Sequence, residues 1–183
     1  MTAKMLSDDC SRCAALCCIA HAFDKGPSFA YHKPAGLPCR NLSDDGNCRI
    51  HDRRTAAGFP GCVRYSCHGA GQRVTQEVFG GRSWRDHPDL TERMMQAFQR
   101  ARQLHLWLLL LAEAAKLPLS PEQRAEAGRL TLLLTPAGRL SEAWLRDTVQ
   151  KTTEAGITAF LTSLRQVAAA RRHAASGQGA FPH

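Results

Sequence analysis

The sequence predicts a mainly α-helical protein, in which a small turn-rich cysteine module precedes a small helical bundle. All eight cysteines lie within the first 67 residues of the 183-residue chain. Glycine- and proline-rich turns dominate up to about residue 86, after which leucine, alanine, arginine and glutamate recur at helical spacing. We therefore expect a cysteine module at residues 1–86, a helical domain at 87–175 and a flexible tail at 176–183.

The helical half begins with a clear helix start. Pro88, together with the capping-box spacing of Asp89 and Glu92, predicts a first helix that runs to about Lys116. One apolar stripe at helical spacing marks its buried face: Met94, Phe98, Ala101, Leu104, Leu108, Leu111 and Ala115.

Two further helices follow. Ser120 before Pro121 predicts the second start, and this helix should end before Pro136. A third helix begins after Ser141, and we expect Gly156 to interrupt it before the apolar pattern resumes. Because helices of this kind bury their apolar stripes on one another, a small bundle is expected.

The composition excludes several classes of protein. An apolar content of 44% and a charged content of 22% are those of an ordinary globular protein, which argues against wholesale disorder. The net charge of +8 is spread over both halves of the chain, so it does not predict a nucleic-acid partner. The start of the chain lacks an apolar signal and no apolar run is long enough to span a bilayer. These features predict a cytoplasmic protein with no membrane partner.

The spacing of the cysteines is the strongest chemical signal. They form three groups: Cys10-x2-Cys13-x3-Cys17-Cys18, Cys39-x8-Cys48 and Cys62-x4-Cys67. Four thiolates complete a zinc site or an iron–sulfur cluster, so eight thiols predict two metal sites that would stabilise the module. His51, three residues after Cys48, is a candidate extra ligand. The arginines beside the cysteines are expected to offset negative charge: Arg12, Arg40, Arg49 and Arg64.

The first group is too crowded for one ion in a continuous helix. Cys10 and Cys17 would stand about 10.5 Å apart along a helix axis, whereas sulfurs around one zinc lie about 3.8 Å apart. Adjacent side chains point in different directions, so we expect Cys17 and Cys18 to serve two different centres, or a centre and a bridge. In this hypothesis the segment is a wall that two metal sites share.

Three other interpretations remain open. Disulfides would need an oxidising compartment. A reduced apolar core would not explain why the cysteines crowd together. A thioredoxin-like pair at Cys10 and Cys13 would need a βαβ pattern, which the sequence lacks.

The cysteine-bearing runs resemble a known family. The cluster Cys10, Cys13 and Cys17-Cys18, with PCRNLSDDGNCRIH at 38–51 and GFPGCVRYSC at 58–67, resembles the CxxCxxCC proteins, which are described as a zinc- or iron-chelating domain. The resemblance covers about residues 8–86, although three residues rather than two separate Cys13 from Cys17. The module also looks like the one that precedes some pentapeptide-repeat proteins, whose repeats this chain lacks. The resemblance implies chelation by the eight cysteines and no particular reaction.

The choice of metal and of function follows from the thiols. Soft thiolates select zinc, iron–sulfur clusters or Cu(I); we rank zinc and iron–sulfur together and copper behind them. All-thiolate sites leave no open position for a substrate, which favours a non-enzymatic metal-binding protein over an enzyme. The helical domain would then bind a protein partner or form a homo-oligomer. The alternative is an iron–sulfur redox protein or metalloenzyme, and a weaker alternative is Cu(I) handling.

Overall fold

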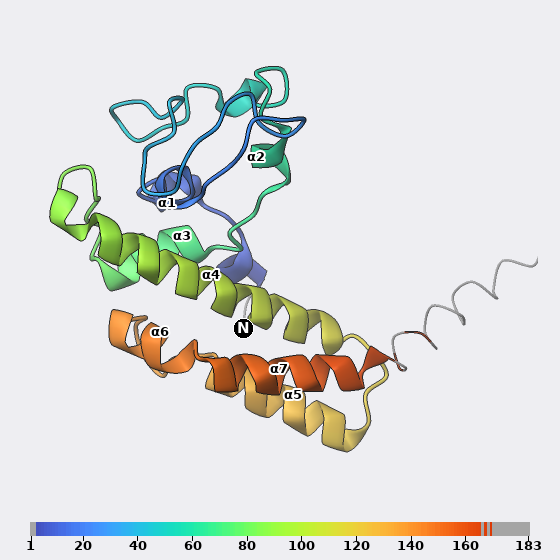
Figure 1. Ribbon diagram of the computed structural model, residues 1–183. Helices are drawn as coiled ribbons and strands as arrows, with labels where there is room; N and C mark the ends of the chain where they lie inside the picture. The colour runs from blue at the N-terminus through green and yellow to red at the C-terminus, as the bar shows by residue number, and fades with distance from the viewer. Residues whose placement is uncertain (1–2, 166, 168, 170–183) are drawn as a thin grey trace, which may run out of the picture.

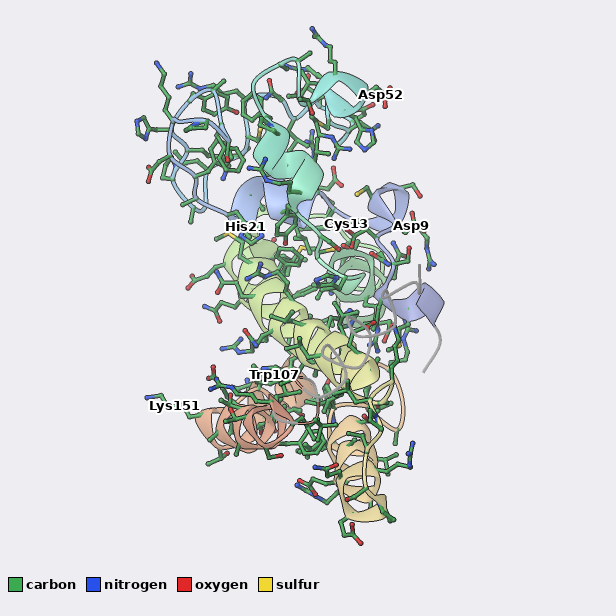
Figure 2. The ribbon with its side chains drawn as sticks, turned by 90° about the vertical axis from the view of Figure 1, so that its right-hand side faces the viewer. Asp9, Cys13, His21, Asp52, Trp107 and Lys151 are labelled. Carbon is green, nitrogen blue, oxygen red and sulfur yellow. The ribbon has the colours of Figure 1, made fainter. Side chains whose placement is uncertain are left out.

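The long helix α4, Thr91–Ala114, forms the middle layer of the molecule (Figure 1). The computed structural model describes residues 3–165, 167 and 169. The cysteine-bearing segments lie on one side of α4, and α5, α6 and α7 lie on the other. A view turned by 90° shows the same order of layers (Figure 2). The tail predicted at 176–183 lies outside the described residues.

The half of the chain that carries the cysteines contains only short helical segments. Its α-helices are α1 (Leu16–Ala20), α2 (Pro60–Arg64) and α3 (Ala70–Arg73), and a π-helical turn, η4 (Val74–Val78), continues α3. Its 3-10 turns are η1 (Ala3–Leu6), η2 (Cys10–Arg12), η3 (His51–Arg53) and, at the junction with α4, η5 (Pro88–Leu90). Over the described part of the chain there are seven α-helices and only isolated β-bridges, which confirms the mainly α fold.

The helical half contains α4, α5 (Pro121–Leu133), α6 (Glu142–Thr148) and α7 (Lys151–Ser163). The Ser120 side chain accepts a hydrogen bond from Gln123 N, and the Gln123 side chain accepts one from Ser120 N. The Ser141 side chain accepts from Trp144 N at the start of α6. Both predicted starts are therefore confirmed, as is the end of α5 before Pro136.

The capping box predicted for α4 is wrong. Leu90 is the N-cap residue and its side chain makes no capping hydrogen bond. The 3-10 turn η5 places Asp89 inside a helical turn rather than before one. Glu92 accepts a hydrogen bond from Gln96 Nε2 instead.

The predicted interruption at Gly156 is also wrong. The chain breaks between α6 and α7 at Val149 and Gln150, and α7 runs through Gly156. Ile157 and Phe160, just beyond the glycine, are 1% and 7% exposed. Burying each such side chain is worth roughly 1.5–3 kcal/mol, which exceeds the cost of about 1 kcal/mol for a glycine in a helix.

One continuous hydrophobic core includes side chains on both sides of α4. The predicted stripe on α4 is buried, with Ala114 in the place expected for Ala115. Leu16 of α1 belongs to this core, as do Leu130 of α5 and Leu145 of α6. The two halves therefore share packing across the predicted boundary at residue 86. No helix in the described ranges is long and apolar enough to cross a membrane.

Candidate metal centre

All eight cysteines line one cavity of about 650 Å³. The thiols come from the segment that ends in α1, from the loop at 39–48, from α2 and from the turn before α3. These segments lie side by side above α4, as Figure 1 shows. The fold therefore gathers every predicted ligand around the same space, and His51 lines it as well.

The first cysteine segment turns rather than forming one helix. The 3-10 turn η2 ends at Cys13, whose backbone is extended. Ala15 then adopts a left-handed conformation with φ of 52°, and α1 begins at the next residue. This turn brings Cys10, Cys13 and Cys17 to one cavity, which a continuous helix would have spread along its axis.

Side chains of α3, η4 and the following loop hold that segment in place. Thr75 Oγ1 accepts a hydrogen bond from Ala14 N at 3.0 Å, and Trp84 Nε1 donates to Ala14 O at 2.7 Å. Gln72 Oε1 accepts from Asp9 N at 3.2 Å. Thr75 and Gln72 are 3% and 9% exposed, so both are buried polar side chains that accept a hydrogen bond from the cysteine segment.

The second cysteine segment attaches to the end of α1. Cys39 N donates to Cys18 O at 3.0 Å, and Gly36 N donates to Ile19 O at 2.9 Å. A β-bridge between Leu42 and Cys48 closes the loop and returns Cys48 to the cavity. The backbone therefore links Cys39 directly to Cys18, and it links Cys48 to Cys39 through Leu42, whose N–H donates to Cys39 O.

Lys33 fixes the same junction from inside the protein. The side chain is 4% exposed, and its Nζ donates to the carbonyl oxygens of Ile19, His21 and Pro34 at 3.3, 2.6 and 3.1 Å. Burial lowers the pKa of Lys33, and the nearby thiols, Cys39 foremost, act in the opposite direction. A cation at the C-terminal end of α1 satisfies carbonyls that the helix leaves unpaired.

Gly71 of α3 lies between two of the sulfurs. A Cβ atom at this position would stand 2.6 Å from Cys13 Sγ and 3.6 Å from Cys67 Sγ. Cys67 Sγ donates a hydrogen bond to Asp8 Oδ1 at 3.1 Å, and Gly69 N donates to the same oxygen at 2.9 Å. The absence of a side chain at Gly71 therefore lets the first and last cysteine groups approach each other.

The distance between Cys17 Sγ and Cys18 Sγ is 4.0 Å. Sulfurs around one tetrahedral zinc are about 3.8 Å apart, so these adjacent cysteines are close enough to share one centre. Their division between two centres, or between a centre and a bridge, stays a prediction. In the described ranges, no three Cys, His, Asp or Glu side chains gather closely enough to hold a single metal ion.

The raised pKa values of Cys10 and Cys13 argue against a reactive pair at these two positions. Burial raises the pKa of Cys13 and of Cys62 to about 11 and that of Cys67 to about 12. Burial also raises the pKa of Cys10. Reactive cysteines have lowered pKa values, so a thioredoxin-like role for Cys10 and Cys13 is disfavoured.

Charge interactions between thiols connect two sets of cysteines, and Cys17 belongs to both. After burial, the thiol of Cys17 contributes to the raised pKa of Cys10, and the thiols of Cys17 and Cys10 contribute to that of Cys13. Cys17, Cys39 and Cys48 act in the same way on the pKa of Cys62. Cys17 thus has neighbours in both groups.

Sequence reasoning missed the basic residues that line the cavity. Arg54 and Arg102 line it, whereas the four arginines that we expected there do not. Arg40, for example, lies over the ring of Tyr31 with 4.8 Å to its centroid. Arg102 could have been recognised because it stands four residues after Phe98, on the buried face of α4.

An unpaired donor also lies in the cavity wall. Asn41 belongs to the loop at 39–48 and lines the cavity. Its backbone oxygen accepts a hydrogen bond from Arg49 N. Its Nδ2 atom is buried and has no hydrogen-bond partner in the part of the chain that the structure describes. Buried donors of this kind are uncommon in proteins, so this atom marks a place where an acceptor would fit.

The chain has a relative of known sequence in Bacillus subtilis (strain 168). It is 40% identical over 121 residues to the uncharacterized protein YybG. The match covers 66% of this chain, and the chain spans 43% of the length of that relative. No family model matches the chain. No solved structure matches it either.

Proposed function

We propose that the chain is a metal-binding protein that holds two thiolate sites, zinc or iron–sulfur clusters, in its eight-cysteine cavity. One observation carries the proposal: four separate segments bring all eight thiols to a single cavity of about 650 Å³. Reduced thiols are needed for this function, which agrees with the cytoplasmic location predicted from the sequence.

The residues present fit such a group chemically. Thiolates are the ligands that zinc, iron–sulfur clusters and Cu(I) prefer. The buried Asn41 Nδ2 would donate to a negatively charged sulfur, as donors near metal–thiolate centres commonly do. Lys33 and Arg54 supply positive charge near the thiols. The thiol of Cys39 acts to raise the pKa of Lys33, and Arg54 acts to lower the pKa of Cys62.

The arrangement of the sulfurs bears on the choice of metal. One zinc ion needs four sulfurs around a point, and the described residues contain no group of three that surrounds one. A polynuclear group occupies more volume and takes ligands that stand farther apart. An iron–sulfur cluster would provide electron transfer, whereas zinc would provide closed structural sites. Cu(I) handling remains the weaker alternative.

The helical half is proposed to bind a protein partner or a second copy of the chain. Leu132 and Leu133 of α5 are 76% and 46% exposed. Leu106 and Leu110 of α4 are also exposed, one helical turn apart. Neighbouring exposed leucines on helices are typical of contact surfaces.

The direct test is metal and sulfide analysis, with a visible absorption spectrum, of protein purified without oxygen. About two zinc ions and no colour would support closed zinc sites. Brown protein with several irons and matching sulfide would support iron–sulfur clusters. Protein that remains metal-free after supply of zinc, and after supply of iron with sulfide, would overturn the proposal.

A pair of neighbouring substitutions on α2 provides the matched control. Cys62→Ser removes a thiol from the cavity, and we expect it to lower the metal content per chain. Val63→Ser introduces the same side chain at the next residue, which is 52% exposed, and should leave the metal content unchanged. Equal metal content in the two variants would count against Cys62 as a ligand.

A further inference from the structure

We propose that the wall of the cavity nearest α4 is a subsite for a small organic anion, with Arg102 as the residue that binds its charged group. The ligand would carry a carboxylate or phosphate on an apolar, ring-sized body. The inference rests on the proposed function only in that the cysteine thiols are taken as the ligands of the metal.

The cavity is large enough for both occupants. Sites for small molecules commonly measure about 300–1,000 Å³, and this cavity of about 650 Å³ lies inside that range. α4 contributes Phe98 and Arg102 to one side of the cavity and no cysteine.

That side is aromatic and carries one cation. Phe98 and Arg102 stand four residues apart on α4, so their side chains lie on the same face. The guanidinium group of Arg102 lies over the ring of Tyr65, 5.9 Å from the ring centroid. An apolar surface beside a guanidinium group is suited to a molecule with an apolar body and an anionic end.

Arg102 has no carboxylate partner among the described residues. None of the ion pairs there includes it. The guanidinium group lines the cavity, so its charge is available to an anion that enters there.

His21 and Tyr65 keep the subsite in one shape. Their side chains share a hydrogen bond of 2.7 Å between Nε2 and the hydroxyl, and their ring centroids are 4.8 Å apart. His21 also packs on Phe98, with ring centroids 5.7 Å apart. Arg102 is the cationic side chain that α4 adds to the cavity lining, so recognition of the anion falls to it.

The charged group that α4 adds to the cavity is a donor. The guanidinium of Arg102 carries only N–H donors. The two carboxylates that line the cavity already accept hydrogen bonds, Asp8 from Gly69 N and Asp9 from Ser11 Oγ. A ligand that carries acceptors therefore fits beside Arg102.

Equilibrium dialysis of labelled benzoate against the protein as purified tests the proposal, with neutral benzamide as the matched probe. We expect benzoate to bind in the millimolar range or better and benzamide to bind at least about tenfold more weakly. Phenyl phosphate in the same assay distinguishes a phosphate from a carboxylate as the preferred group. If neither anion binds at about 10 mM, or if benzamide binds as well as benzoate, the proposal is overturned.

Substitutions locate the binding. Arg102→Gln should weaken benzoate binding about tenfold or more, and Arg49→Gln, an exposed arginine outside the cavity, should leave it unchanged. Arg102→Lys keeps the charge without the two-pronged geometry, so an intermediate affinity is expected, and it serves if Arg102→Gln does not fold. Unchanged binding in both Arg102 variants overturns the proposal.

Metal content measured on the same samples separates the two proposals. Metal-free protein that still binds benzoate through Arg102 would overturn the metal site alone. Metal-loaded protein that binds neither organic anion would overturn the subsite alone.

Discussion

The ammonium group of Lys33 lies 2.6 Å from the carbonyl oxygen of His21. The same group donates to the carbonyls of Ile19 and Pro34, so one buried side chain joins the end of α1 to the segment that leads to Cys39. Three cavity features depend on this junction: the position of Cys18, that of Cys39 and the orientation of His21.

Lys33→Met should therefore destabilise the fold. Methionine fills a similar volume but removes the Lys33 donor from His21 O and Pro34 O, while Ile19 O keeps its bond from Gly36 N. We expect a loss of roughly 2–4 kcal/mol in the free energy of unfolding. Urea denaturation followed by far-ultraviolet circular dichroism measures it. Lys25→Met, on the same loop but exposed, should change the stability by less than about 0.5 kcal/mol. Similar losses in the two variants would show that the buried contacts of Lys33 contribute little.

Gly71→Ala should reduce both stability and metal content. Alanine normally stabilises a helix relative to glycine by about 1 kcal/mol, but here its Cβ would stand 2.6 Å from Cys13 Sγ. The sulfur must move, and Cys67 Sγ, 3.6 Å from the same point, restricts where it can go.

Gly128→Ala in α5 is the matched control, because nothing lies within 4 Å of its added Cβ. This change should stabilise the protein by roughly 0.5–1 kcal/mol and leave the metal content as it was. Thermal melting and metal analysis of both variants provide the comparison. If Gly71→Ala also stabilises the protein, the close approach at Cys13 is not a constraint in solution.

Thr75→Val should loosen the first cysteine segment. Thr75 is 3% exposed, and valine has nearly the same shape but cannot accept the hydrogen bond from Ala14 N. A buried N–H without a partner costs about 1–3 kcal/mol. Thr131→Val in α5 removes a hydroxyl that only donates to Ala127 O of its own helix, and a smaller effect is expected. Hydrogen exchange at Ala14 should speed up in the first variant only; slow exchange in both would contradict this account.

Acid should destabilise the protein through His105. This side chain is fully buried on α4, where it contacts His68 O and Arg73 Nη1 and faces Glu77. Burial, its main cause, lowers the pKa of His105 to about 4 from the ordinary 6.5. The unfolded chain therefore binds a proton more readily between these values. Stability from His105 is complete above about pH 6.5 and is lost as the pH falls towards 4.

The size of this effect is roughly 2–3 kcal/mol for one histidine. It is best measured as the difference in unfolding free energy between wild type and His105→Gln at pH 7.5 and pH 5, because a common pH dependence of the thiols then cancels. The variant should lose less stability on acidification than wild type does. His87→Gln, an exposed position, should follow wild type. Equal losses in all three proteins would exclude His105 as the cause.

Local signals account for the parts of the fold that the sequence predicted well. Ser120 and Ser141 mark helix starts because a capping hydrogen bond is made within three residues. The predicted interruption at Gly156 is wrong because the free-energy cost of a glycine in a helix is local. The burial of Ile157 and Phe160, which outweighs this cost, depends on residues far away in the sequence.

The candidate site divides in the same way. Clustering of the cysteines predicted that they meet, because thiols of similar chemistry recur at short spacing. Nothing local indicates that Lys33 is buried, since this depends on how its segment packs on the end of α1. The spacing of Arg102 from Phe98 places it on the buried face of α4, but its position at the cavity depends on how α4 crosses the cysteine segments. The grouping of the eight thiols into two sites remains a prediction.

The contribution of α4 to the cavity has a consequence for biosynthesis. Ribosomes release the chain from its N-terminus, so the last thiol, Cys67, emerges into solution before Phe98 and Arg102 do. At about 5–20 residues per second, the complete set of thiols waits roughly 2–7 seconds for the helix that forms the far wall. During that interval a nascent chain presents eight cysteines to whatever metal donors or oxidants the surrounding solution contains.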